Sequence, residues 1–215
     1  MITGANYDFN QRGYGAHQAI MELVRAGTNV LDVGCASGYL MKHLQEEKSC
    51  HCVGIEMNVE AAKEAANLGF DVVAEGALGA LPSLEDRGPF DHIVFGDVLE
   101  HMVDPLQVLE GYRSLLTWDG TIIVSLPNIV SLVARCRIAC GIWRYEEMGI
   151  FDRTHLRFFT VRSGRELLTQ AGFSIVDQRF VGPLTVYGGK QFARITRFRP
   201  QLLANGMIFS AQLTH

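Results

Sequence analysis

The sequence predicts an α/β fold built on one doubly wound, mostly parallel sheet. Short apolar runs rich in β-branched residues alternate with stretches whose apolar residues recur at helical spacing. The length of 215 residues fits a single domain, which would bury roughly 70% of the surface that the unfolded chain exposes. Because strands that alternate with helices are joined by right-handed crossovers, we expect helices on both faces of the sheet.

Seven apolar runs have the length and composition of strands, and most are bounded by glycine, proline or polar residues. They lie at residues 29–33, 50–55, 71–74, 90–95, 121–126, 173–180 and 207–212. The run at 90–95 is almost continuously apolar, as expected of a central strand that is covered on both faces.

The helices between these strands are marked by caps and by apolar residues at helical spacing. They are expected at residues 16–24, 40–44, 58–68, 105–116, 129–142 and 160–171, with one short helix in the connection 75–89. Asn58 and Thr160 can cap two of them, and Pro105 suits the first turn of another. Residues 127–160 form a long insertion after the fifth strand, where it overhangs the crevice in which such sheets bind ligands.

Composition and charge exclude several classes of protein. Apolar residues make up 48% and charged residues 20% of the chain, the balance of a soluble globular protein. The net charge of -4 lacks the basic footprint of a nucleic-acid binder, and no apolar stretch is long enough to span a membrane. Five cysteines, an odd number, suit a reducing compartment. We therefore expect a cytoplasmic protein whose residues 1–215 form one domain.

The turn after the first strand carries the strongest functional signal. Gly34 and Gly38 flank three small residues and let a ligand approach the backbone. The Gly-x-Gly-x-x-Gly fingerprint of dinucleotide-binding enzymes fails, because the chain has Ala36 and Tyr39 at the later two places. Asp32 would repel a pyrophosphate but could stabilise a cationic ammonium or sulfonium group. A nicotinamide-dependent oxidoreductase is therefore disfavoured.

Several segments, in order, resemble the class I S-adenosylmethionine-dependent methyltransferases. They are residues 32–38, 53–56, 90–101, 115–120 and 125–128, within a resemblance that covers residues 28–180. The pattern Asp97-x-x-Glu100-His101 is similar to the ubiquinone-pathway O-methyltransferases. The run 151–160 is similar to bacterial small-molecule methyltransferases of surface sugar or lipid biosynthesis.

The resemblance implies a Rossmann-like sheet of seven strands with an antiparallel last strand, and S-adenosyl-L-methionine (SAM) as cofactor, released as S-adenosyl-L-homocysteine (SAH). Asp32 and Gly34 would hold the methionine portion, and Glu56 would accept hydrogen bonds from both ribose hydroxyls. Asp97 would lie beside the methionine ammonium or the transferring methyl. The other cofactor-binding positions that the resemblance implies are Cys35, Ala36, Gly38, Met57, Gly76 and Ala77.

Two of these positions depart from the family pattern. Ala36 replaces the middle glycine of the turn. Ala77 stands where the family usually has an adenine-binding acid after the third strand, which leaves only backbone contacts to the adenine. Met57 would lie against the adenine face.

Methyl transfer to an oxygen or nitrogen needs a general base only to make the acceptor nucleophilic. His101, with Glu100 as its orienting carboxylate, is one candidate, and His155 on the insertion is the rival. Each histidine also has a purely structural interpretation, as helix-start packing for His101 and as a lid hydrogen bond for His155. The cysteines and histidines do not show a metal-ligating pattern, so no metal is expected.

We expect a small-molecule methyltransferase that acts on oxygen. Residues 1–28 would form an N-terminal helical cap, and residues 127–160 a lid that selects the substrate. Three arginines, Arg135, Arg137 and Arg144, fit either a solvated helix face or a clamp for an anionic or lipid-linked acceptor. Two alternatives stay open: a SAM-binding regulatory or interaction module without turnover, and a methionine-biosynthesis accessory protein.

Overall fold

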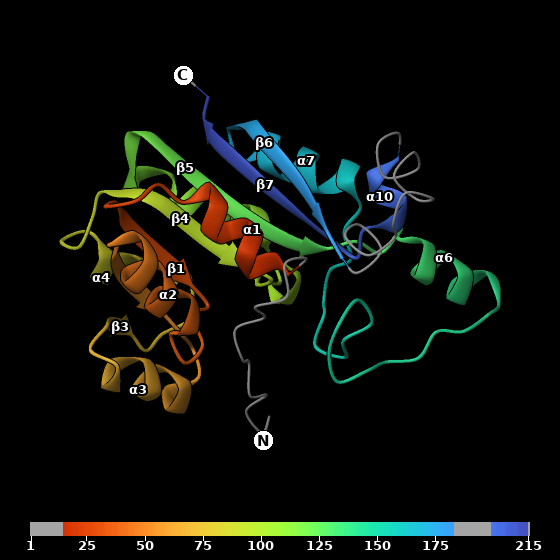
Figure 1. The fold of residues 1–215 in the computed structure, drawn as a ribbon, viewed down its shortest axis with the longest axis horizontal. Helices are drawn as coiled ribbons and strands as arrows, with labels where there is room; N and C mark the ends of the chain where they lie inside the picture. The colour runs from red at the N-terminus through yellow and green to blue at the C-terminus, as the bar shows by residue number, and fades with distance from the viewer. Residues whose placement is uncertain (1–14, 183–198, 215) are drawn as a thin grey trace.

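The protein, seen in a computed structural model that describes residues 15–182 and 199–214, is built around one mixed sheet (Figure 1). The strand order is β3-β2-β1-β4-β5-β7-β6. The strands are β1 (Asn29–Val33), β2 (His51–Ile55), β3 (Asp71–Val73), β4 (Phe90–Gly96), β5 (Leu116–Pro127), β6 (Phe173–Val181) and β7 (Gly206–Leu213). Strands β1 to β5 pair in parallel, and β7 runs antiparallel to both β5 and β6. The expected seven strands with an antiparallel last strand are confirmed.

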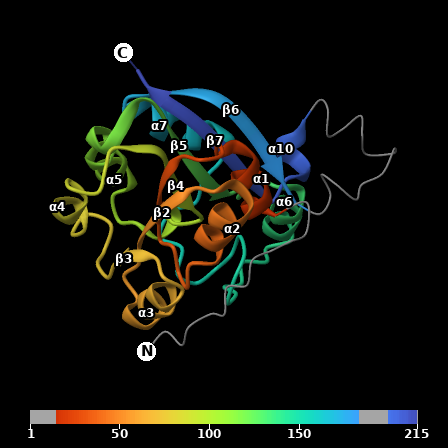
Figure 2. The same ribbon diagram turned by 60° about the vertical axis from the view of Figure 1, so that its left-hand side comes forward.

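Helices cover both faces of this sheet (Figure 1, Figure 2). They are α1 (Ala16–Leu23), α2 (Tyr39–Lys48), α3 (Val59–Asn67), α4 (Leu81–Leu84), α5 (Pro105–Gly111), α6 (Leu132–Ala139), α7 (Val161–Gln170) and α10 (Pro200–Leu203), with 3-10 turns η1 (Leu99–His101) and η2 (Arg113–Leu115). Helices α1, α2 and α3 share one core cluster with the sheet, and α4, α5 and α7 share the other. The doubly wound arrangement is therefore confirmed.

Local capping signals set several helix starts. The Asn58 side chain accepts hydrogen bonds from the Glu60 and Ala61 amides, and Thr160 forms a reciprocal capping box with Ser163. Caps of this kind contribute about 1 kcal/mol each to helix stability. Both caps expected from the sequence are thus confirmed.

Two segments differ from the sequence-based expectation. The helix expected at 105–116 ends at Gly111, because Leu116 already pairs with Phe90 and extends β5 beyond the apolar run at 121–126. The helix expected at 129–142 is shorter, and α6 begins only after its cap, Ser131. Just before it, Asn128 forms a bridge with Phe159, so this backbone is used in tertiary contacts rather than in a helical turn. In both places long-range pairing outweighs local helix propensity.

The described residues include part of the expected N-terminal cap and all five cysteines. Helix α1 packs against the sheet, and residues 1–14 of the expected cap lie outside the described residues. All five cysteines are free: Cys35, Cys50 and Cys52 are buried, and Cys136 and Cys140 are exposed. Within the described ranges, no helix has the length and apolar character needed to cross a bilayer.

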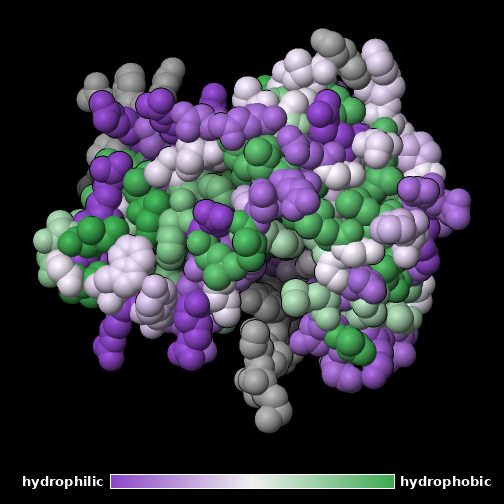
Figure 3. Space-filling model, turned by 180° about the vertical axis from the view of Figure 1, so that it is seen from behind, coloured by the Kyte–Doolittle hydropathy of each residue, from purple (hydrophilic) through white to green (hydrophobic). Residues whose placement is uncertain are grey.

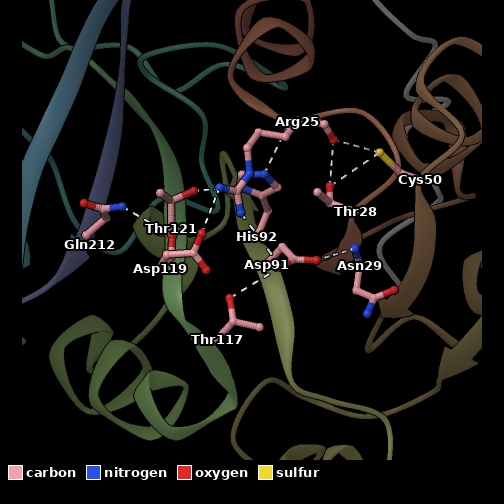
Figure 4. Close-up of polar contacts among 10 residues, drawn as sticks. All are labelled: Arg25, Thr28, Asn29, Cys50, Asp91, His92, Thr117, Asp119, Thr121 and Gln212. Carbon is pink, nitrogen blue, oxygen red and sulfur yellow. Dashed lines mark hydrogen bonds and ion pairs between the residues drawn. The ribbon is translucent and has the colours of Figure 1, made fainter.

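A polar cluster joins the strands at the amino ends of β1 and β4 (Figure 4). His92, only 2% exposed on β4, accepts a hydrogen bond at Nε2 from the Arg25 amide (3.1 Å). Its Nδ1 lies 2.7 Å from the Thr121 hydroxyl of β5. Because the amide can only donate, Nε2 must be unprotonated and the ring neutral. Burial is the main cause that lowers the pKa of His92, to about 4, and the positive charge of Arg25 adds to it.

This buried imidazole should make folding sensitive to acid. Its pKa is near 6.5 in the unfolded chain and about 4 in the folded protein, so the unfolded state binds the proton more strongly. We expect no cost above pH 6.5 and a loss of about 3 kcal/mol in the free energy of unfolding as the pH falls to 4. Urea unfolding of His92→Gln should show a correspondingly flatter pH dependence.

The matched control for this measurement is His51→Gln, which removes an exposed histidine at the start of β2. It should retain the pH dependence of the natural sequence. Equal slopes for all three proteins would contradict the role assigned to His92.

Candidate functional site

The turn between β1 and α2 lies at the carboxyl end of the parallel strands. Gly34, Ala36 and Gly38 have positive φ angles of 77°, 48° and 82°, a region that favours glycine. A Cβ on Gly34 would stand 2.6 Å from a methyl carbon of Val98, and one on Gly38 would stand 3.0 Å from the Cβ of Ala65. The small residues of this turn therefore let the backbone approach a neighbour or a ligand closely, and Ala36 adopts the strained conformation itself.

Glu56 follows β2 and closes this turn. Its Oε2 accepts a hydrogen bond from the Ala36 amide (3.0 Å), and its Oε1 accepts one from the Asn58 amide (2.7 Å). A carboxylate has about four acceptor positions, so two stay available for ligand hydroxyls. Met57, next to Glu56, is 78% exposed. Glu56 could therefore bind the hydroxyls of a ribose, and Met57 could pack against a flat ring beside that ribose.

Asp32 lies in β1, directly between Gly54 of β2 and Val94 of β4, and is 3% exposed. Burial raises the pKa of its carboxyl group to about 7, and the charge of Glu56 adds to this shift. Among the ion pairs of the described residues, none involves Asp32. A buried carboxylate without a cation is costly. The position therefore fits a ligand that brings a positive charge.

Asp97 follows β4 and borders the same crevice. It is exposed, has a positive φ of 55°, and accepts a 2.6 Å hydrogen bond from the Ser125 hydroxyl. A non-glycine residue in this conformation is strained, and such strain concentrates at functional sites. The carboxyl ends of β1, β2 and β4 thus each present an acid, as the sequence predicted.

Two further side chains near this crevice were missed by the sequence analysis. His17 of α1 and Tyr39 of α2 approach within 2.9 Å between Nε2 and the phenol oxygen. Burial is the main cause that lowers the pKa of His17, and the charge of Asp97 opposes it. This contact depends on the packing of α1 and α2 against the same face of the sheet, which helical spacing alone does not show.

Three other positions expected to bind the cofactor differ in which of their atoms remain accessible to a ligand. Cys35 is buried, and a Cβ on Gly54 would stand 2.6 Å from its sulfur, so only its backbone faces the turn. Gly76 is exposed beside open space. Ala77 is 8% exposed, and its carbonyl accepts the Tyr112 hydroxyl at 2.6 Å. The adenine contact expected there stays a prediction.

A second cluster forms where η1 meets the insertion. Glu100, His101 and His155 place one ligand atom each within 4.8 Å of one another. Glu100 is fully buried, and within the described part of the chain both of its carboxyl oxygens lack a hydrogen-bond partner. Burial raises its pKa well above the usual range, and the charges of Asp97 and Asp152 add to it. The sequence did not predict this grouping, because His155 reaches it only through the path of the insertion.

The structure does not show the bond expected between Glu100 and His101. Instead, Oε1 of Glu100 lies 3.9 Å from Nε2 of His155. One carboxylate and two imidazoles are a usual donor set for a divalent cation, so these three residues could hold one.

Thr154 supplies the polar contacts of the His101 ring, which also packs edge-on against His155. The His101 Nδ1 lies 3.2 Å from the Thr154 carbonyl oxygen and 3.1 Å from its hydroxyl oxygen. Asp152 Oδ1 in turn accepts hydrogen bonds from the Thr154 amide (2.7 Å) and hydroxyl (2.6 Å). Burial alone would raise the pKa of Asp152, but the bonds from Thr154 and the nearby His155 and His101 outweigh it and lower that pKa.

Comparison with known families agrees with this geometry. A family profile described as "Methyltransferase domain" matches residues 10–178. The chain belongs to this methyltransferase family. A ubiquinone biosynthesis O-methyltransferase from Xylella fastidiosa is 32% identical over 107 residues, which cover 48% of this chain and 43% of that protein. The match thus spans less than half the length of this relative.

Solved structures show the same fold for this family member. A SAM-dependent methyltransferase from Archaeoglobus fulgidus has a TM-score of 0.64 at 20% identity, covering 92% of this chain and 94% of its own. The 1,6-didemethyltoxoflavin-N1-methyltransferase of Burkholderia thailandensis, with bound 1,6-didemethyltoxoflavin and SAH, has a TM-score of 0.63 at 19% identity, covering 96% and 80%. The Rossmann-like methyltransferase fold is confirmed.

The insertion at residues 127–160 presents an aromatic and apolar surface. Trp143 packs edge-on against Phe151 and Phe158, with ring centroids 5.2 Å and 5.4 Å apart. Nine large apolar residues of residues 127–160 are more than a third exposed: Leu132, Val133, Ile138, Ile142, Trp143, Tyr145, Met148, Leu156 and Phe158. Figure 3 shows hydrophobic beside strongly hydrophilic atoms on its left-hand side, the side of α6.

The arginines of the insertion are partly engaged within the protein. Arg137 donates to Glu146 at 2.8 Å and lies 4.2 Å above the Phe151 ring. Arg135 donates to the Val130 carbonyl, and Arg144 stays exposed. A shallow depression in the surface of the insertion is lined by Pro127, Ile129, Ile150, His155, Arg157, Phe158 and Phe159. It contacts the second cluster through His155.

Proposed function

We propose that this protein transfers the methyl group of SAM to an oxygen of a small-molecule acceptor. The observation that carries the proposal is Asp32, a buried carboxylate without an ion-pair partner in the described residues, beside a turn that Glu56 closes. Both features fit the cofactor: the acid suits its cationic methionine portion, and the two free acceptor positions of Glu56 suit its ribose. When bound, SAM supplies a methyl carbon that its sulfonium group already activates.

Cofactor binding and turnover are separate parts of this proposal, and each has its own measurement. We expect titration calorimetry to show heat of binding with both SAM and SAH. Radiolabelled methyl transfer should then appear with an oxygen-bearing acceptor from a panel of phenols, sugars and lipid precursors. Absence of binding would overturn the proposal, and binding without transfer to any acceptor would favour the regulatory or interaction module.

His101 is the base that we propose for the acceptor oxygen. It lies on η1, directly after the crevice strand β4, and is held by the insertion through Thr154. Positioning of the acceptor in line with the methyl carbon supplies much of the acceleration, and removal of the acceptor proton supplies the rest. Residues 127–160 act as the lid that shapes the acceptor site.

A cation-assisted variant of this site is favoured by one observation, the buried Glu100 carboxyl that lacks a partner among the described residues. A divalent cation held by Glu100, His101 and His155 would lower the pKa of an acceptor hydroxyl. Dialysis against a chelator distinguishes the two mechanisms. If His101 acts without a metal, turnover should be unchanged after dialysis. If a cation assists, turnover should be lost and should return with added Mg²⁺, Mn²⁺ or Zn²⁺.

The exposed surface of the insertion supports a lipid-linked acceptor. Between residues 129 and 145 the chain has three arginines and no acid, although its net charge is -4. Trp143 and Ile142, 46% and 48% exposed, are amphipathic and apolar residues of the kind that enter a bilayer interface. The free cysteines support the cytoplasmic location that we propose.

Vesicle binding tests this acceptor class directly. We expect the protein to sediment more with vesicles of phosphatidylcholine and phosphatidylglycerol than with phosphatidylcholine alone, because the arginines attract anionic lipid. The double variant Ile142→Ser, Trp143→Ser should reduce the bound fraction severalfold. Val176→Ser, which alters an equally exposed residue on β6, is the control. Equal losses for both variants would contradict a specific surface.

A further inference from the structure

Two oxygen atoms of one residue face the same nitrogen of His101. The carbonyl and hydroxyl oxygens of Thr154 lie 3.2 Å and 3.1 Å from Nδ1. A carbonyl oxygen can only accept a hydrogen bond, whereas a hydroxyl group can either accept or donate. The direction in which the Thr154 hydroxyl points its proton therefore decides whether Nδ1 faces two acceptors or one acceptor and one donor.

Asp152 settles that direction. Its Oδ1 lies 2.6 Å from the Thr154 hydroxyl oxygen and 2.7 Å from the Thr154 amide nitrogen, and its side chain is buried. A carboxylate has no proton to give, so the hydroxyl proton must point at Asp152. Thr154 then offers only lone pairs to His101. A neutral imidazole in that position carries its proton on Nδ1 and leaves the lone pair on Nε2.

We propose that Asp152 and Thr154 are positioning residues that hold His101 as the Nδ1–H tautomer and so keep its Nε2 lone pair free for the acceptor proton. This inference deepens the proposed function, because it explains how His101 can serve as the base. Among the described residues, no other side chain forms a hydrogen bond with the His101 ring. A catalytic imidazole in the wrong tautomer cannot accept the proton at the required atom.

Backbone contacts between the insertion and η1 help to orient His101. The Leu156 and Arg157 amides donate to the Glu100 carbonyl at 2.8 Å and 3.0 Å, and these bonds hold the segment after Thr154 against η1. A third contact, from the Arg157 guanidinium to the Val103 carbonyl at 2.6 Å, continues the attachment. His101 is therefore oriented only while residues 152–157 lie against η1, which couples the lid to the chemistry.

The first test reads the tautomer without any turnover. Full-length protein labelled with 15N-histidine is examined by long-range 1H–15N correlation at a pH where the rings are neutral, with a chelator present. His101→Gln assigns the signal. We expect Nδ1 of His101 to carry the proton, and observation of the Nε2–H form would overturn the proposal. If methyl transfer itself is absent, this measurement still decides the inference separately from the proposed function.

The second test asks whether a second substitution restores the activity lost in Asp152→Ala, which would not happen if Asp152 had only a structural role. In Asp152→Ala the freed Thr154 hydroxyl can donate to Nδ1 and favour the wrong tautomer, so we expect kcat to fall about 10-fold or more with the KM for SAM unchanged. Adding Thr154→Val removes that donor and should restore the Nδ1–H signal and part of kcat. Thr154→Ser keeps the hydroxyl and should stay within about twofold of the natural sequence.

The control for these variants is Arg153→Gln, in the same turn. The Arg153 side chain pairs with Glu147, and the hydrogen bonds of the His101 ring in the described part of the chain come from Thr154 instead. It should leave both kcat and the tautomer unchanged. If the double variant is no better than Asp152→Ala, or if Arg153→Gln loses as much, the positioning role is wrong and the turn merely holds the lid together.

Discussion

Asp32→Asn should make the free protein more stable at pH 8 and at the same time weaken SAM binding by about 100-fold or more. Burial raises the pKa of this carboxyl group to about 7, so its charged form is disfavoured in the folded protein. Asparagine removes that charge at nearly constant volume. The ligand, however, loses a charge-assisted contact in a buried site, and such contacts contribute about 2 to 5 kcal/mol to binding.

The pH dependence of this effect follows from the direction of the shift. The folded protein binds the Asp32 proton more tightly than the unfolded chain, with pKa values of about 7 and 3.8. The cost of the charge is therefore absent below pH 4, grows between pH 4 and 7, and is complete above pH 7, where it reaches about 4 kcal/mol. Stability relative to Asp32→Asn should fall as the pH rises through this window.

Calorimetric titration with SAM and thermal unfolding measure the two effects in the same samples. Affinity of the natural sequence should fall about tenfold per pH unit below 7, because the proton competes with the cationic ligand, and Asp32→Asn should lose this dependence. Asp86→Asn, an exposed acid near α4, is the control and should change neither quantity. Unchanged affinity in Asp32→Asn would contradict the assigned role.

The gathering of three acids at one edge of the sheet could be predicted because backbone topology alone determines it. Asp32, Glu56 and Asp97 stand at the ends of three parallel strands, and parallel strands bring their carboxyl ends to one edge of a sheet. Strand assignment from apolar runs was therefore enough to bring these acids together. The same reasoning could not show that Glu56 bonds to Ala36, since that contact depends on the conformation of the turn.

The acceptor side could not be predicted in the same way. His101 and His155 meet because residues 152–157 fold back onto η1, and this path depends on contacts far apart in sequence. The contact of Thr154 with His101 has no local signal, and Glu100 was assigned the orienting role only because it is the neighbour in sequence. The early start of β5 at Leu116 and the short α6 show the same limit, since tertiary pairing decided both.

His101→Gln should lower kcat by about 10² to 10⁴, the usual contribution of a general base, without weakening SAH binding. His155→Gln should cost less than about tenfold. The difference arises from what each ring already contacts. His155 has a side chain only 6% exposed, with Nδ1 3.4 Å from the Ile150 carbonyl and Nε2 facing Glu100. His101 has its Nδ1 held by Thr154, which leaves Nε2 for the acceptor.

Both variants should be compared at saturating SAM, with SAH affinity measured by calorimetry as the check that the cofactor site is intact. A loss confined to kcat identifies a group that acts in the transition state, whereas a parallel loss of SAH affinity identifies a cofactor contact. If His155→Gln lost more turnover than His101→Gln, the two roles would have to be exchanged. The base would then lie on the insertion itself, and closure of residues 127–160 would deliver it to the methyl acceptor.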